Sequence, residues 1–255
     1  MHVRVMPSLG DAIYCRPFVK AFATSIETKW PALFSDLVFR GGDDRTIAPR
    51  YDSKNLALGS IPQAIGRFFP PLSEIRLDLP PVAPSGRPPY ALVRAPTLRS
   101  RFYAPARNPD ARYIRQAGEI VRARGYRLIG IGTVGPDEVF DGDPPVVDEA
   151  FWHGELAIEE LLALVAGASL IVAGPGWTVP ASMAYGVPHV IVYGGAAKWN
   201  SVDKLIDERM PKPRLATVEP DGFCRGCKDV RHDCDKRITG FEEKFSDALD
   251  HAMCL

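Results

Sequence analysis

The first part of the chain alternates between short apolar segments and amphipathic ones. An apolar run at residues 2–6 predicts a strand. After a turn, the apolar positions from residue 12 to residue 23 recur at helical spacing, with Pro17 inside the pattern as a point where this helix starts or kinks. We predict two further strands, at residues 37–40 and 74–79, and a short helix at residues 61–69.

The second part repeats this alternation more regularly. Its predicted strands occupy residues 90–94, 127–133, 170–173 and 189–193, and its predicted helices occupy residues 110–124, 155–166, 178–185 and 241–254. Strands that alternate with helices indicate parallel sheets joined by crossover helices, so the predicted fold class is α/β.

A proline-rich stretch separates the two parts. Five of the ten residues from 80 to 89 are proline, which is the composition of a linker. We therefore predict a first domain at residues 1–85, a second at residues 86–240, and a helical C-terminal segment at residues 241–255.

The composition is that of a globular protein. Of the 255 residues, 46% are hydrophobic and 24% are charged, which excludes a disordered or fibrous chain. Residues 161–197 carry no charge, but six glycines and three prolines interrupt them, so they predict a buried sheet rather than a membrane span. The first residues lack the apolar stretch of a signal peptide. We expect a soluble, cytoplasmic protein without a transmembrane segment.

The formal net charge of zero conceals two segments of opposite sign. Residues 87–127 contain ten arginines, whereas residues 137–160 contain nine acidic residues and no lysine or arginine. Two interpretations are open: the segments neutralise each other, or some of the arginines bind an anionic ligand, because the guanidinium group matches phosphate and carboxylate oxygens bidentately.

Two turns follow predicted strands and open predicted helices. Gly174, Gly176 and Thr178 belong to the sequence GPGWT, in which glycines allow close approach of a ligand and the helix N-terminus favours an anion. The spacing matches neither a P-loop nor a dinucleotide-binding fingerprint. The other turn contains Ser8, Gly10 and Asp11, where the aspartate either caps the helix or acts as a general base.

Together these turns resemble glycosyltransferase family nine, which includes the heptosyltransferases. Residues 6–13 (MPSLGDAI) and 18–22 (FVKAF) resemble the start of that family, and residues 161–174 and 184–194 resemble its donor-binding core. The resemblance implies a GT-B fold, in which two Rossmann-like domains with parallel sheets face each other across a cleft. It places a nucleotide sugar in the C-terminal domain and the acceptor in the N-terminal one, and it implies a last helix that packs back on the first domain.

The resemblance also implies roles for individual residues. Asp11 corresponds to the proposed base, with Ser8 and Gly10 on the acceptor side. The implied donor-binding residues are Thr97, Arg99 and Arg101 for the diphosphate (with Arg107 as a substitute), Glu155 for the ribose, and Gly174, Gly176, Trp177 and Thr178 at the second turn. The turn lacks the aspartate and the histidine that the family places there.

A cysteine-rich segment follows the donor-binding core. Cys224 and Cys227 have the CxxC spacing, and His232 and Cys234 follow them, so these four side chains are candidates for a tetrahedral zinc site. A second CxxC pair is absent, and free thiols are the alternative in an intracellular protein.

These observations favour an inverting glycosyltransferase that uses a nucleotide-diphosphate sugar and needs no cofactor or metal for the transfer. In this reading Asp11 deprotonates the acceptor hydroxyl of a saccharide or another acceptor. Two alternatives are kept: a glycosyltransferase that acts on hydroxymethylated bases in DNA, which the arginine-rich segment permits, and a non-catalytic nucleotide-sugar binding module, which the missing family residues suggest.

Overall fold

The N-terminal half is built around a small parallel sheet. The computed structural model describes residues 1–42, 45–57, 59–83, 86–225 and 227–254. The strand order is β2-β1-β3, and the elements of this half are β1 (His2–Arg4), α1 (Leu9–Phe22), β2 (Ser25–Glu27), the 3₁₀ helix η1 (Pro31–Phe34), β3 (Thr46–Ile47), α2 (Ser53–Ala57) and α3 (Ile61–Gly66). The helix α1 runs through Pro17 without ending there.

The C-terminal half contains a larger parallel sheet. Its strands, in spatial order, are β11 (Leu215–Val218), β10 (His189–Val192), β9 (Leu170–Ala173), β4 (Tyr90–Arg94), β6 (Arg127–Ile131) and β8 (Glu149–Phe151). A separate antiparallel pair consists of β5 (Thr97–Arg99) and β7 (Glu138–Phe140). The predicted α/β fold with parallel sheets is confirmed.

Helices cover both faces of the larger sheet. Along β9, Leu170 and Val172 face α4 (Ala111–Ala123) and α8 (Phe241–Cys254), whereas Ile171 and Ala173 belong to the cluster that includes α5 (Ile158–Ala166) and α6 (Thr178–Tyr185). Successive side chains of a strand point to opposite faces, which explains why these buried strands are continuously apolar. The short helices η2 (Pro105–Arg107), η3 (Ala197–Trp199) and α7 (Val202–Leu205) lie in the connections.

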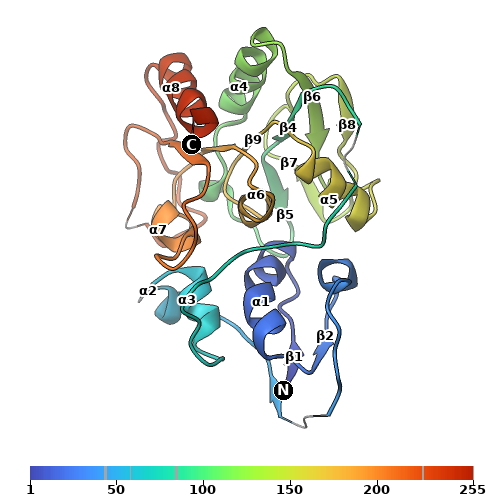
Figure 1. Ribbon diagram of the computed structural model, residues 1–255. Helices are drawn as coiled ribbons and strands as arrows, with labels where there is room; N and C mark the ends of the chain where they lie inside the picture. Colours follow the sequence, from blue (N-terminus) through green and yellow to red (C-terminus); the bar gives the residue numbers. More distant parts are fainter. Residues whose placement is uncertain (43–44, 58, 84–85, 226, 255) are drawn as a thin grey trace.

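The two halves share one apolar core. The cluster on the α5 and α6 face extends into the N-terminal half, where Val3, Phe18 and Ile65 belong to it. Figure 1 shows α6 beside α1, with the N-terminal half (blue to cyan) below the C-terminal half. The predicted domain boundary falls at Ser85, which lies outside the described residues.

The last helix packs within the C-terminal half. The buried side chains of α8, which include Phe241, Phe245 and Leu249, belong to the cluster with α4, β10 and β11. The resemblance led us to expect packing against the N-terminal half. In the structure α8 instead covers the opposite face of the larger sheet (Figure 1), because its apolar stripe matches β10 and β11.

Two predicted strands are wrong. Residues 37–40 and 74–79 form no strand. In the second segment Ile75, Leu77 and Leu79 are buried, as the alternating pattern predicts, but the Ile75 amide donates to the carbonyl of Arg209 at 3.0 Å rather than to a neighbouring strand. An alternating pattern indicates that one side of an extended segment is buried, but it does not show that the segment pairs with a neighbouring strand.

Three predicted strands, at residues 2–6, 127–133 and 189–193, are shorter in the structure, where β1 ends at Arg4, β6 at Ile131 and β10 at Val192. No helix among the described residues has the length and apolar character needed to cross a membrane.

Candidate functional site at the junction of the two halves

The turn after β1 and the turn after β9 touch each other. Gly10 lies so close to Trp177 that a β-carbon on Gly10 would stand 3.1 Å from the Cα atom of Trp177 and 3.4 Å from its Cβ atom. Each turn follows the carboxyl end of a parallel strand and leads into a helix, which is the place where α/β sheets bind ligands. We call these two touching turns, at residues 7–11 and 174–178, together with the side chains around them, the junction.

Asp11 is held by two hydroxyl groups at the junction. The Ser8 hydroxyl donates to Asp11 Oδ2 at 2.5 Å, and the Tyr51 hydroxyl donates to Asp11 Oδ1 at 2.6 Å. Ser8 is also the N-cap of α1, because its Oγ accepts a hydrogen bond from the Asp11 amide at 3.3 Å. The side chain that caps the helix is therefore that of Ser8, and the carboxylate of Asp11 is bound only by side-chain hydroxyls among the hydrogen bonds described.

Tyr51 is a member of the site that the sequence did not reveal. Its pKa lies well above its ordinary value, first because the phenol is buried and then because Asp11 lies beside it and accepts its hydrogen bond. The phenol therefore keeps its proton and remains a donor to Asp11. Tyr51 lies in a connection between β3 and α2, where no sequence pattern singles it out.

Arg107 brings a cation from the C-terminal half to the junction. Its Nη2 atom donates to the carbonyl of Pro175 at 3.4 Å, and its Nε atom is buried with no hydrogen-bond partner in the described part of the chain. Burial lowers the pKa of this guanidinium, whereas nearby Tyr51 and Asp11 favour its charged form. An unpartnered N–H donor beside the glycine turn is a group that an anionic ligand can satisfy.

The other implied diphosphate ligands contact protein carboxylates. Glu138 is 7% exposed and accepts hydrogen bonds from Thr97, from Arg99 Nε at 3.0 Å and from Thr133 at 2.7 Å. Arg94 also reaches Glu138, at 3.3 Å. Arg101 has a side chain that is 89% exposed and lies 3.9 Å from Asp137.

The arginine-rich segment is largely neutralised by the acidic one. Every arginine of residues 87–127 except Arg107 has a carboxylate oxygen within 4.0 Å of its side-chain nitrogens in the described structure. The first of the two interpretations of the charge pattern therefore holds for most of these arginines, whereas Arg112 and Arg124 pair with Asp110 and Asp250 outside the acidic segment and Arg107 has no carboxylate partner in the described structure.

Glu155 lies outside the helix that the sequence assigned to it. The helix α5 begins at Ile158, because Glu160 accepts from the Ala157 amide at 2.9 Å and fixes the start there. Glu155 is exposed in the preceding loop and accepts from the His153 amide at 2.9 Å.

The glycine turn is tightly packed at Gly174 and open at Gly176. A β-carbon on Gly174 would lie 2.9 Å from Pro109 Cδ, whereas the nearest atom to one on Gly176 would be Arg94 Nη1, at 4.0 Å. Thr178, at the start of α6, is fully buried, and its Oγ1 atom has no hydrogen-bond partner among the described residues. Trp177 is partly buried against the shared core, so part of its indole is in contact with the core and part is accessible.

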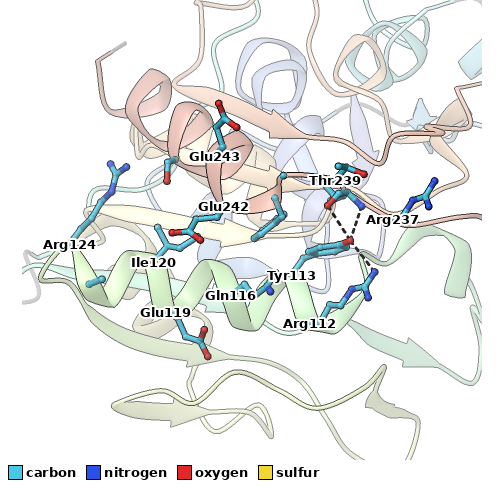
Figure 2. Close-up of a pocket in the computed structure, with 15 residues that line it drawn as sticks. Arg112, Tyr113, Gln116, Glu119, Ile120, Arg124, Arg237, Thr239, Glu242 and Glu243 are labelled. Carbon is cyan, nitrogen blue, oxygen red and sulfur yellow. Dashed lines mark hydrogen bonds between the residues drawn. The ribbon is translucent and has the colours of Figure 1, made fainter.

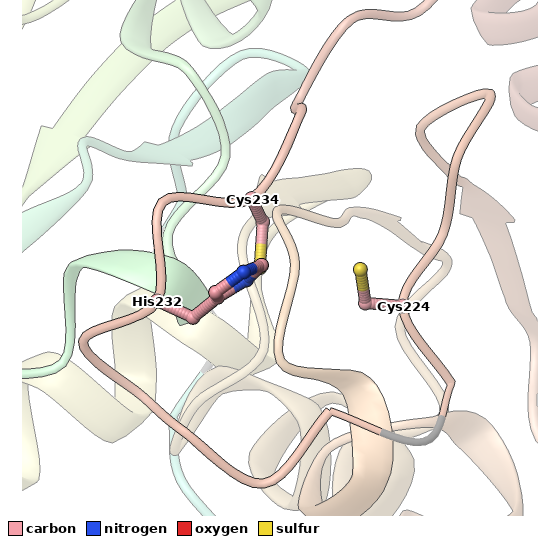
Figure 3. Close-up of side chains that lie close together, drawn as sticks. All are labelled: Cys224, His232 and Cys234. Carbon is pink, nitrogen blue, oxygen red and sulfur yellow. The ribbon is translucent and has the colours of Figure 1, made fainter.

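Three of the four metal-ligand candidates meet in space. The ligand atoms of Cys224, His232 and Cys234 all lie within 4.8 Å of one another (Figure 3). His232 Nδ1 is 3.1 Å from Cys234 Sγ, and the Cys227 amide donates to the Cys224 carbonyl at 3.0 Å in the CxxC turn. Burial and the neighbouring thiols of Cys224 and Cys227 raise the pKa of Cys234 to about 11. Cysteine sulfurs beside an imidazole are the donor set that zinc or iron prefers.

A wide groove lies elsewhere on the molecule. It has a volume of about 1270 Å³ and runs between α4 and α8 (Figure 2). In it the Tyr113 hydroxyl accepts from the Ile238 amide at 2.7 Å and from Arg112 Nη2 at 3.0 Å. The groove is on the face of the larger sheet opposite α5 and α6, so it is separate from the junction.

Comparison with known proteins identifies the fold. No protein-family model matches the sequence, and no curated protein matches it either. Among solved structures, the iron-containing dodecameric glycosyltransferase TibC of enterotoxigenic Escherichia coli is 15% identical, with a TM-score of 0.59 over 100% of this chain and 72% of that one.

Two further solved structures show the same likeness. A family 9 glycosyl transferase of Veillonella parvula is 12% identical, with a TM-score of 0.56 over 99% of this chain and 96% of that one. The E. coli ADP-heptose LPS heptosyltransferase II is 10% identical, with a TM-score of 0.51 over 99% of this chain and 98% of that one. The chain therefore has a heptosyltransferase-like GT-B fold, as the resemblance implied.

Proposed function

We propose that this chain is a glycosyltransferase that moves a sugar from a nucleoside-diphosphate sugar to an acceptor hydroxyl. The proposal rests on two charges near one glycine turn that opens a helix: Arg107, from the C-terminal half, donates to the carbonyl of Pro175 in that turn, and Asp11, from the N-terminal half, is near enough to favour the charged form of Arg107. A base and an anion-binding cation on opposite sides of one junction are the two groups that sugar transfer from a diphosphate requires.

In this proposal Asp11 removes the proton from the acceptor hydroxyl. That oxygen attacks the anomeric carbon on the side opposite the diphosphate, the bond from this carbon to the diphosphate oxygen breaks, and the configuration inverts. Tyr51 and Ser8 orient the carboxylate through the hydrogen bonds described above. Because Tyr51 remains protonated, it cannot itself accept the proton from the acceptor.

Arg107 and the N-terminus of α6 stabilise the leaving diphosphate. The Arg107 guanidinium is the cation of the arginine-rich segment that lacks a carboxylate partner in the described structure, and it contacts the turn at Pro175. A preorganised cation and helix dipole stabilise developing negative charge without reorganising. A related structure, TibC, was solved in complex with ADP-D-β-D-heptose, which supports an ADP-sugar as the donor to test first.

A saccharide is a more suitable acceptor than DNA. Binding of duplex DNA depends on unpaired cations that neutralise phosphates, and the arginines of residues 87–127 other than Arg107 are paired with carboxylates. The arginine-rich segment therefore offers little free positive charge to DNA.

We propose a structural metal at the cysteine cluster, apart from the chemistry of transfer. Cys224, Cys227, His232 and Cys234 would hold a thiolate-preferring ion such as zinc or iron, and TibC is described as iron-containing. When bound, the ion would cross-link the loop that contains these residues.

Ligand binding tests the proposal. Thermal unfolding is measured with a panel of nucleoside diphosphates and nucleotide sugars, since a ligand at one hundred times its Kd adds about 2.7 kcal/mol to the free energy of unfolding. The same titrations are made with Arg107→Ala and, as a matched control, with Arg101→Ala, whose side chain is exposed.

We expect the Arg107 variant to lose about tenfold or more in nucleoside diphosphate affinity, the value of one charge-assisted hydrogen bond, and the Arg101 variant to lose little. Stabilisation by none of the nucleotide ligands, or equal loss in both variants, would contradict the proposal.

A further inference from the structure

The short helix that presents Arg107 is held by the cysteine loop, which we define as the described residues of the range 224–236. The amide of Ala106 donates to the carbonyl of Val230 at 2.9 Å, and the ammonium group of Lys236 donates to the carbonyl of Pro105 at 2.9 Å. The Ala106 amide and the Pro105 carbonyl both belong to η2, and these two residues immediately precede Arg107 in the chain. The cysteine loop therefore fixes η2 from one side.

The loop after β10 also holds η2. The Gly195 amide donates to the carbonyl of Ala106 at 2.6 Å. A β-carbon on Gly195 would lie 2.2 Å from Cys234 Cβ, so this loop is packed directly against the cysteine cluster. Ala106, Ala196 and Cys234 form one small buried cluster, with Cys224 and Cys227 against it.

The cysteine loop has little structure of its own to hold this arrangement. Its described residues contain no helix or strand, only turns and bends. One set of side-chain contacts within it joins Cys224, His232 and Cys234, whose ligand atoms lie within 4.8 Å of one another. A bound ion would replace these weak contacts by coordinate bonds, and the binding energy of a structural metal appears directly as stability of the loop that it closes.

We propose that the cysteine loop is a metal-dependent clamp that positions Arg107, so that metal occupancy sets the affinity of the junction for the diphosphate of its donor. The effect on donor affinity rests on the proposed function, in which Arg107 binds the diphosphate. The clamping of η2 rests only on the contacts above. Without the ion, the Val230 and Lys236 contacts loosen, and Arg107 no longer stands beside Pro175.

The test uses the full chain and two cysteine variants. Cys224→Ser removes one ligand of the cluster. Cys254→Ser is the matched control, because Cys254 is exposed at the end of α8. For each protein, elemental analysis measures zinc and iron, calorimetry measures affinity for ADP and for adenosine, and hydrogen exchange measures protection of the Ala106 and Gly195 amides.

We expect wild type and Cys254→Ser to contain about one equivalent of metal and Cys224→Ser to contain almost none. In Cys224→Ser, ADP affinity should fall about tenfold or more while adenosine affinity holds, and the two amides should lose their protection. If the ion acts through Arg107, the double variant Cys224→Ser/Arg107→Ala should bind ADP as weakly as Arg107→Ala alone.

Wild-type protein without bound metal would overturn the proposal, as would a metal-free Cys224→Ser protein with the ADP affinity and amide protection of Cys254→Ser. Should Cys224→Ser fail to fold, chelation and reloading of the wild-type protein give the same readouts, with circular dichroism as the check on folding. If Arg107→Ala alone leaves ADP affinity unchanged, the proposed role of Arg107 fails, while exchange at Ala106 and Gly195 still decides whether the clamp exists.

Discussion

Gly10 and Trp177 join the two halves of the molecule at the point where the reaction is proposed to occur. A β-carbon on Gly10 would lie 3.1 Å from the Cα atom of Trp177, which is tighter than an ordinary van der Waals contact of a β-carbon. The close approach of the second turn therefore favours glycine at this position. The same contact fixes how far Asp11 stands from the turn that begins α6.

A valine at position 10 should disturb this contact. We expect Gly10→Val to lower the free energy of unfolding by about 1–3 kcal/mol, as overpacking does, and to reduce turnover of the donor as well. Chemical denaturation and a donor-consumption assay measure the two effects. Gly222→Val is the control, because a β-carbon on Gly222 meets nothing within 4 Å. Equal free energies of unfolding and equal turnover in the two variants would show that the contact between Gly10 and Trp177 does not matter.

Tyr51 should act by orienting Asp11. Tyr51→Phe removes the hydrogen bond of 2.6 Å to Asp11 Oδ1 and leaves the ring in place. We expect kcat to fall by about tenfold, the equivalent of one hydrogen bond to a charged group, while KM for the donor changes little. Steady-state kinetics separates the two constants. A change confined to KM would mean that Tyr51 contacts the donor rather than positioning the base.

His189 should make the protein less stable in mild acid. Its ring is fully buried, and burial lowers its pKa to about 3, against about 6.5 in an unfolded chain. Between these values the unfolded chain binds a proton that the folded protein does not. Stability is therefore lost as the pH falls below 6.5, by up to about 1.4 kcal/mol per pH unit.

Urea unfolding from pH 7 down to pH 4 measures this slope. In His189→Asn this contribution should be missing, whereas His251→Asn, at an exposed position of α8, should keep it. Parallel pH profiles for wild type and His189→Asn would contradict the assignment.

The sequence predicted the regular parts of the fold well and the contacts between distant segments poorly. Strands β4 and β9 and helices α6 and α8 lie where the hydrophobic pattern places them, because each is a continuous apolar or amphipathic segment. The strands β2 and β3 are two or three residues long and have no pattern of their own. They are strands only because β1 lies between them.

The residues of the candidate site could likewise be predicted from the sequence only in part. Ser8, Gly10 and Asp11 could be selected from a local motif; the structure brings Gly10 against the second turn and joins Ser8 to Asp11 by a hydrogen bond. Tyr51 and Glu138 could not be selected, because their roles depend on partners far along the chain. Glu138 also explains why Thr97 and Arg99 are less available to a ligand than the loop sequence suggests, and why Arg107, the substitute, becomes the stronger candidate.

Exchange of Asp11 for asparagine tests the central claim most directly. The helix start should survive, because Ser8 supplies the N-cap. The rate of ADP release from ADP-heptose, with water as the acceptor, is compared between wild type and Asp11→Asn, together with ADP affinity and Tm. We expect the rate to fall by about 10²–10⁴-fold, the usual contribution of general-base catalysis, while ADP affinity and Tm change little. An Asp11→Asn protein that releases ADP at the wild-type rate would contradict the account.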